Sequence, residues 1–309
     1  MKILLFGKNG QVGWELQRSL APLASSGQLI ALGSDSQTMC GNLAEPEGIQ
    51  QTVQRVRPDI IINAAAYTAV DKAEKESPLA QTINALAPAV LAEEARRLNA
   101  WLIHYSTDYV FDGTGDQPRI ETDAANPLNV YGKTKLAGEK KILESGCLHV
   151  ILRTSWVYAT YGNNFVKTIL RLAQERDQLQ IVDDQVGAPT GAELLADVTA
   201  HIVQLLRNQR DNPAVNGLYH LTAKGYTSWY GFARFILTQA ARANVSLKTT
   251  PGNLHPIASA DYPTPAKRPH NSRLDSAKLQ KTFNLCLPEW QGGVSRTLTE
   301  VLGSYPKTV

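Results

Sequence analysis

The sequence has few of the residues that build metal sites, disulfide frameworks or membrane anchors. It contains three cysteines and six histidines among 309 residues. Cys40, Cys147 and Cys286 are isolated and the histidines do not cluster, so we expect reduced thiols and no zinc or other histidine-based metal site. No apolar stretch approaches the roughly 20 residues that span a bilayer. Because Met1 and Lys2 lead directly into an apolar run, we expect no signal peptide, no membrane partner and a cytoplasmic protein.

Charge is also nearly balanced, with 31 basic and 28 acidic residues and a net charge of +3. The basic residues are scattered, which gives no support for a nucleic-acid partner, although single Lys or Arg side chains could still bind a diphosphate. The length and the hydrophobic content of 43% allow a full core. We therefore expect one large domain plus a smaller one.

Glycine is concentrated behind the first apolar run. Residues 1–6 have the length of a strand, three glycines follow at G-x-x-G-x-x-G spacing, and residues 14–20 have helical periodicity. Such a turn lets the backbone approach a pyrophosphate, and the helix amino terminus adds donors and partial positive charge. The alternative is a structural turn that opens a flavodoxin-like sheet. The residues expected to contact a dinucleotide here are Gly7, Gly10, Gln11, Val12 and Gly13.

Strand-like and helix-like segments then alternate. Apolar runs cover residues 28–32, 59–66, 101–111 and 149–154, and helical patterns cover 46–56, 78–98 and the segment around 131–135. This alternation predicts an α/β fold: a Rossmann-like doubly wound parallel sheet with a smaller C-terminal substrate-binding domain. We expect an NAD(P)-binding domain over 1–155, with later segments returning to its sheet, and mostly a substrate domain over 156–309. Ligands should bind at the carboxyl ends of the strands.

Tyr131 and Lys135 are the most informative pair, because four-residue spacing on a helix stacks a phenol and an ammonium on one face. A phenol is a weak acid near neutral pH, and a fixed positive charge beside it lowers its pKa. This layout is typical of a tyrosine that acts as a catalytic acid. The alternative is an exposed helix face with an ordinary surface lysine.

Five further blocks carry a resemblance. They are Ser106–Gly113, Pro127–Glu139, Arg153–Tyr158, Gln185–Thr190 and Arg268–Arg273. In this order, behind the glycine turn, they resemble the dTDP-4-dehydrorhamnose reductase family of extended short-chain dehydrogenase/reductases, from Met1 to about Glu300. The resemblance implies NADPH- or NADH-dependent reduction of the 4-keto group of dTDP-4-dehydro-L-rhamnose to dTDP-L-rhamnose, the last step of dTDP-rhamnose biosynthesis.

The resemblance also implies roles for individual residues. Tyr131 would donate the proton, Lys135 would also hydrogen-bond the nicotinamide ribose, and Thr107 would hold the substrate oxygen. The implied substrate-binding residues are Thr107, Asp108, Trp156 and Arg268. Small side chains after the 59–66 strand would let the cofactor approach; the alternative is simple tight packing of helix on strand. The remaining implied cofactor-binding residues are Asn42, Leu43, Ala64, Ala65 and Ala66.

Two features concern cofactor choice and metal. NAD-selective enzymes place a carboxylate at the end of the second strand; here Gly33 and Ser34 follow Leu32. The missing charge makes NADPH easier to accept, although Asp35 could oppose this.

The resemblance further implies a homodimer with Mg²⁺ at its interface, and Mg²⁺ prefers oxygen ligands. The alternative is that the same glutamates lie on exposed helix faces without a metal. The matching residues are Glu15, Glu193 and Glu300.

Two other functions stay open. A sugar-nucleotide dehydratase or epimerase of the same superfamily is the first, but a dehydratase should carry Thr-Asp-Glu where this chain has Thr107-Asp108-Tyr109. A non-catalytic relative, such as the regulatory subunit of methionine adenosyltransferase, is the second. Such a relative need not keep a matched Thr, Tyr and Lys, and this chain retains all three.

Overall fold

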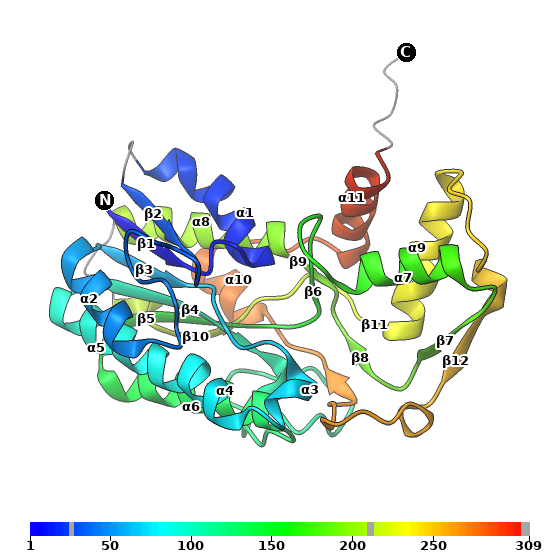
Figure 1. Cartoon of the computed structure of the whole chain (residues 1–309), viewed down its shortest axis with the longest axis horizontal. Coiled ribbons are helices and arrows are strands. Elements are labelled where there is room, and N and C mark those ends of the chain that lie inside the picture. The colour runs from blue at the N-terminus through cyan, green and yellow to red at the C-terminus, as the bar shows by residue number, and fades with distance from the viewer. Residues whose placement is uncertain (25–27, 209–212, 304–309) are drawn as a thin grey trace, which may run out of the picture.

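A parallel sheet of six strands forms the centre of the molecule (Figure 1). The computed structural model describes residues 1–24, 28–208 and 213–303. The strands occur in the order β2-β1-β3-β4-β5-β10, and every neighbouring pair is parallel. Their bounds are β1 Ile3–Phe6, β2 Leu29–Leu32, β3 Ile60–Asn63, β4 Trp101–Thr107, β5 Leu148–Thr154 and β10 Gly217–His220.

Helices cover both faces of this sheet, which is why its strands have continuous apolar character. Ile3 and Leu5 of β1 pack toward one layer of helices, and Leu4 and Phe6 pack toward the other. Each fully buried Ile or Leu contributes roughly 1.5–3 kcal/mol. The first layer contains α1 (Gln11–Leu20), α8 (Ala192–Asn208) and α10 (Ala277–Phe283). The second contains α2 (Pro46–Val56), α5 (Ala87–Leu98) and α6 (Val130–Ser145).

Several predicted bounds shift for local reasons. The predicted 101–111 strand ends at Thr107, whose hydroxyl accepts from the Tyr109 amide and starts the 3₁₀ turn Asp108–Val110. The predicted 78–98 helix begins with α4 (Ser77–Gln81) and contains a π turn over Thr82–Leu86 before α5. The Ala87 amide bonds back to Thr82, and Pro88 has no N–H to continue an ordinary ladder. The short helix α3 (Val70–Ala73) was not predicted.

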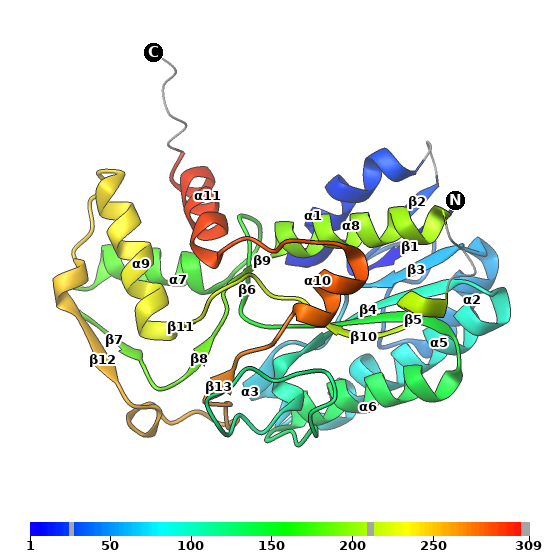
Figure 2. The ribbon, with the colours of Figure 1, turned by 180° about the vertical axis from the view of Figure 1, so that it is seen from behind.

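A smaller lobe lies beside the sheet (Figure 2). Its core contains Phe232 and Trp290 and is built mainly by α7 (Phe165–Glu175), α9 (Trp229–Arg242) and α11 (Trp290–Leu302). Strand β7 (Leu179–Val182) pairs with β12 (Leu254–Ile257) at its margin. No helix in the described ranges is long and apolar enough to cross a membrane.

Short strands connect the two parts of the molecule. They are β6 (Val157–Tyr158) with β9 (Thr190–Gly191), and β8 (Val186–Gly187) with β11 (Thr227–Ser228) and β13 (Asn271–Ser272). Single 3₁₀ turns lie at Ala21–Leu23, Pro213–Val215, Pro251–Asn253 and Ser259–Asp261. Because α8, β10 and α10 pack with the central sheet, the second half of the chain contributes to both lobes. The predicted domain boundary at residue 155 stays a prediction.

Candidate active site

A cleft of about 840 Å³ opens at the carboxyl ends of the central strands. The chain passes from β1 to β2 on one side and then crosses to β3 on the other, and ligands of open α/β sheets bind at such a switch point. The structure brings most of the predicted site residues together here. Those that line the cleft are Gly7, Gly10, Gln11, Val12, Asn42, Leu43, Ala64, Ala65, Ala66, Thr107, Asp108, Tyr131, Lys135 and Trp156.

The glycine turn fits a dinucleotide. Gly7 has φ +93°, and a Cβ there would lie 2.7 Å from the Ala65 nitrogen. A Cβ on Gly13 would lie 1.9 Å from the Gly7 oxygen, so Gly13 permits close packing of α1 on β1 rather than lining the cleft. A Cβ on Gly10 would meet only the Gly7 oxygen, at 3.4 Å. The backbone at the start of α1 is therefore open to a phosphate.

Helix α6 is held in place by polar contacts at its amino-terminal half. The Asn129 side chain accepts from the Gly132 amide at 2.8 Å and caps the helix. Asn84, in the π turn, donates to the Thr134 hydroxyl at 3.1 Å. A Cβ on Gly138 would lie 2.1 Å from the backbone carbonyl oxygen of Asn84, so glycine is needed for this close approach of α6 to the π turn. These contacts fix the helix that carries Tyr131 and Lys135.

Tyr131 has a hydroxyl partner rather than a cationic one. Its side chain hydrogen-bonds Thr107, and the Thr107 hydroxyl donates to Asp108 Oδ1 at 3.0 Å. Burial, with a contribution from the negative Asp108, raises the pKa of Tyr131 to about 12. The expectation that Lys135 lowers this pKa is therefore wrong for the free protein. The phenol stays protonated at neutral pH, as a proton donor requires.

Lys135 is directed into the sheet instead. Its Nζ donates to the Tyr105 carbonyl at 2.6 Å and lies 3.2 Å from His104 Nε2. Burial lowers the pKa of Lys135 to about 8, against the opposing charge of Glu139. Burial, together with the nearby charge of Lys135, holds the pKa of His104 well below its ordinary value.

His104 was not predicted as a site residue because it lies within an apolar strand. Its Nδ1 is 3.1 Å from Asn63 Nδ2, so polar contacts join β3, β4 and α6 beneath the cleft. The only signal in the sequence is a single polar residue inside the run Trp101–Tyr105.

Asp108 is also buried. Burial raises the pKa of its carboxyl to about 6, although Ser272 and Thr107 hydrogen-bond it.

A second chamber of about 1010 Å³ lies between α7, β7 and the loop 259–270. Trp229 lines both this chamber and the cleft, and its ring stacks on Trp156 with centroids 3.6 Å apart. Trp156 has φ +48°, a left-handed conformation that costs a non-glycine residue about 1–2 kcal/mol. Trp229 was not predicted as a site residue, because an aromatic residue at the start of a helix indicates core packing.

Arg268 lines the second chamber and not the cleft. Its Nη2 lies 2.9 Å from Asp71 Oδ2, and its side chain hydrogen-bonds Tyr109. Its buried Nη1 has no hydrogen-bond partner among the described residues. The positive guanidinium beside the chamber suits an anionic group.

The three predicted magnesium ligands are paired with arginines. Arg296 Nε lies 3.5 Å from Glu193 and 3.2 Å from Glu300, and Arg18 Nε lies 3.0 Å from Glu15. Burial raises the pKa of Glu193, Arg296 opposes this, and Glu300 and Glu15 add to it. Within the described part of one chain, no three His, Cys, Asp or Glu side chains form a group that could hold a metal ion. One chain alone therefore does not fit Mg²⁺, and a shared site stays a prediction.

Comparison with known proteins agrees with this geometry. The family described as "RmlD substrate binding domain" matches residues 1–302. The dTDP-4-dehydrorhamnose reductase of Shigella flexneri is 56% identical over 301 residues, covering 97% of this chain and 98% of its own. The corresponding Burkholderia thailandensis protein is 44% identical over 303 residues, covering 98% and 99%.

Solved structures agree as well. The dTDP-4-dehydrorhamnose reductase of Bacillus anthracis, solved with NADP, has a TM-score of 0.84 and 35% identity, covering 97% of this chain and 100% of that one. A Clostridium acetobutylicum structure of the same name has a TM-score of 0.84 and 34% identity, covering 98% and 100%. The chain therefore belongs to the family of the RmlD substrate-binding domain.

Proposed function

We propose that this chain reduces the 4-keto group of dTDP-4-dehydro-L-rhamnose to dTDP-L-rhamnose with NADPH or NADH. The observation that carries the proposal is the hydrogen-bonded Tyr131 and Thr107 pair, which lies in the same cleft as the glycine turn. The second chamber adjoins this cleft at Trp229. The 56% identity to the dTDP-4-dehydrorhamnose reductase of Shigella flexneri supports this choice of substrate.

The reaction requires the protein to supply a proton donor and to orient it. When bound, the reduced nicotinamide supplies a hydride to the carbonyl carbon, so negative charge develops on the oxygen. Tyr131 donates its proton to that oxygen, and Thr107 orients the phenol through their hydrogen bond. Because burial keeps the phenol protonated, the donor is ready before the substrate binds.

Lys135 has a positioning role in this mechanism. Its ammonium is anchored to the Tyr105 carbonyl, one helical turn from Tyr131 and beside the cleft. From there it can hydrogen-bond the nicotinamide ribose. The amides at Gly10, Gln11 and Val12 would bind the pyrophosphate at the other side of the cleft.

The second chamber is the proposed site of the nucleotide part of the substrate. Arg268 lines the chamber and brings a positive guanidinium that suits a diphosphate, and the stacked Trp156 and Trp229 form the wall between the chamber and the cleft. Asp108 and Thr107 would contact the sugar. On this view residues 156–309 supply mostly substrate contacts, as the proposed domain division states.

Tyr109 argues against a dehydratase. A dehydratase would use a glutamate base at this position, whereas Tyr109 has a buried phenol next to Arg268. Burial raises the pKa of Tyr109, so it stays protonated and cannot act as a base near neutral pH. A regulatory relative is disfavoured by the intact Thr107, Tyr131 and Lys135 arrangement.

One turnover assay tests the proposal. Purified protein, enzymatically made dTDP-4-keto sugar and NADH or NADPH should give loss of nicotinamide absorbance together with dTDP-L-rhamnose as the product. Absorbance loss with a product epimeric at C4 would make the chain a different reductase. Conversion without nicotinamide oxidation would indicate an epimerase or dehydratase, and no conversion a non-catalytic relative.

We further propose a cytoplasmic protein that forms a homodimer, with no nucleic-acid partner. The three free cysteines support a reducing compartment. A dimer in which a second chain adds ligands could still hold Mg²⁺ near Glu15, Glu193 and Glu300. Such an ion would be structural, since Tyr131 already supplies the proton.

A further inference from the structure

The chain has no carboxylate at the last residue of β2, but the following turn brings one back. Leu32 ends the strand, and the Ser36 amide donates to the Gly33 carbonyl at 3.1 Å. The Gly33 amide in turn donates to the Ser36 hydroxyl at 3.0 Å. This closed turn folds Asp35 over the end of the strand.

The Asp35 carboxylate then lies between the strand end and the glycine turn. Its Oδ1 accepts from Asn9 Nδ2 at 2.8 Å. A Cβ built on Gly33 would lie 2.6 Å from this oxygen and 2.8 Å from the Asn9 nitrogen. Glycine at position 33 therefore leaves the space that the carboxylate uses. Asn9, Gly33 and Ser34 line the cleft at this end, and the exposed Asp35 stands at its rim beside Asn9 without lining the cleft itself.

The position is about 20 residues beyond the glycine turn, where dinucleotide-binding folds place the acid that bonds the ribose 2′-hydroxyl. The alternative solution, an arginine that accommodates a 2′-phosphate, is not found there. Among the described residues that line the cleft, Lys135 is the only Lys or Arg, and it contacts β4 beneath Tyr131.

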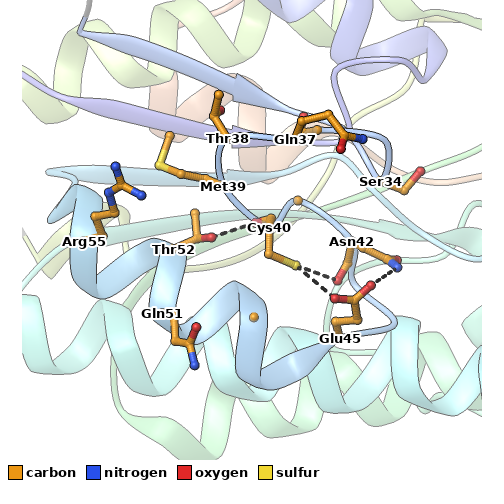
Figure 3. A pocket seen from close by; sticks show the side chains of 13 residues that line it. Ser34, Gln37, Thr38, Met39, Cys40, Asn42, Glu45, Gln51, Thr52 and Arg55 are labelled. Atoms are coloured by element: carbon orange, nitrogen blue, oxygen red, sulfur yellow. Dashed lines mark hydrogen bonds between the residues drawn. The ribbon is translucent and has the colours of Figure 1, made fainter.

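An adjoining chamber of about 420 Å³ does contain an arginine. Ser34, Gly41 and Asn42 line both this chamber and the cleft. Figure 3 shows Arg55 and Ser34 at opposite ends of the chamber, with Glu45 near Asn42. A 2′-phosphate next to Ser34 would thus lie close to Asp35 and away from Arg55.

We propose that Asp35 replaces the missing strand-end carboxylate, binds the adenosine ribose 2′-hydroxyl and makes this chain favour NADH over NADPH. The proposal rests on the proposed function, which requires a nicotinamide dinucleotide but leaves its identity open. A carboxylate accepts hydrogen bonds from a ribose diol and repels a phosphate placed in the same position. On this proposal, Asp35 opposes the easier acceptance of NADPH that the missing strand-end carboxylate predicts.

The test is direct binding of NADH and NADPH to the full chain without sugar, by calorimetry or quenching of protein fluorescence. The wild type should bind NADH at least about tenfold more tightly than NADPH. Asp35→Asn keeps the size and an acceptor for Asn9 but removes the charge, so the two dissociation constants should come within about threefold, mainly by tighter NADPH binding. Glu144→Gln removes an exposed carboxylate near the far end of α6 and should leave the ratio unchanged.

Three outcomes overturn the proposal. If the wild type binds NADH and NADPH equally and Asp35→Asn does not change either affinity, the proposed role of Asp35 is excluded. The proposed reductase function would be unaffected by this result. If Glu144→Gln changes the ratio of the NADH and NADPH dissociation constants as much as Asp35→Asn does, the effect comes from net charge and not from a local contact. Failure of the wild type to bind either nucleotide would remove the proposed function, and the role of Asp35 with it.

Discussion

The cleft and the second chamber are built in different ways. The cleft is formed at the ends of neighbouring strands by backbone, glycine, alanine and hydroxyl groups, above a sheet with apolar contacts on both faces. The chamber is formed mainly by side chains from three separate stretches of the sequence: α7 with β7, the start of α9, and the loop 259–270. In the proposed function, chemistry falls to the regular lobe and substrate selection to the irregular one.

The largest effect is expected for Tyr131→Phe, which should lose turnover but keep nucleotide binding. Tyr131→Phe keeps an aromatic ring in edge contact with Tyr109, whose centroid is 5.6 Å away, but removes the proton donor. We expect kcat to fall about 10²–10⁴-fold, with the dissociation constant for NADH changed less than about twofold. Steady-state kinetics and nucleotide titration measure the two effects. A variant with wild-type kcat would exclude Tyr131 as the acid.

Asp108 tests whether the cleft contains a destabilising charge. Its pKa is raised from 3.8 to about 6, so the folded state binds more protons than the unfolded state between these values, and stability falls as pH rises through that window. Asp108→Asn should therefore raise the free energy of unfolding by on the order of 3 kcal/mol near pH 7.5. Near pH 4 the gain should be small. Urea unfolding at both pH values measures this.

Asp112 provides the matched control for this experiment. Hydrogen bonds from Thr114 lower the pKa of Asp112, so its ionised form stabilises the fold above the pKa of the unfolded chain. Asp112→Asn should therefore lower stability near pH 7.5, opposite in sign to Asp108→Asn. Stabilisation by both variants would indicate an effect of net charge and would contradict the assignment to buried Asp108.

Trp156 lies where the two regions meet, and two substitutions separate its ring from its backbone. Trp156→Ala and Trp156→Gly both remove the stack on Trp229, so each should weaken dTDP-sugar binding roughly tenfold and NADH binding little. Glycine accepts φ +48° without strain. The Gly variant should therefore be about 1 kcal/mol more stable than the Ala variant. Equal loss of both ligands would assign Trp156 a purely structural role.

The smallest effect is expected for metal removal. If Mg²⁺ binds at a shared interface near Glu193 and Glu300, EDTA should shift a dimer toward monomer in sedimentation while kcat at saturating substrate changes less than about twofold. Unchanged sedimentation and thermal stability would exclude the metal site. Loss of turnover with the dimer intact would contradict a structural role.

Much of the regular lobe could be predicted because its signals are local. The glycine spacing, the apolar runs and the four-residue step from Tyr131 to Lys135 each lie within one or two elements. Helix α2 has the predicted bounds of Pro46 and Val56. The π turn before Pro88 and the partners of Asn84 in α6 could not be predicted, because they depend on how closely two helices pack.

The sequence by itself therefore determined the sheet and the glycine turn and pointed to Tyr131 as the proposed proton donor, since these follow from periodicity and residue type. Only the tertiary structure decided the environment of each group. It turned Lys135 toward Tyr105, set the phenol of Tyr131 against Thr107 and folded Asp35 against Asn9. It also paired the predicted metal ligands with Arg18 and Arg296. The physical reason is that pKa and ligand preference depend on burial and on charges brought close by long-range packing, neither of which residue spacing records.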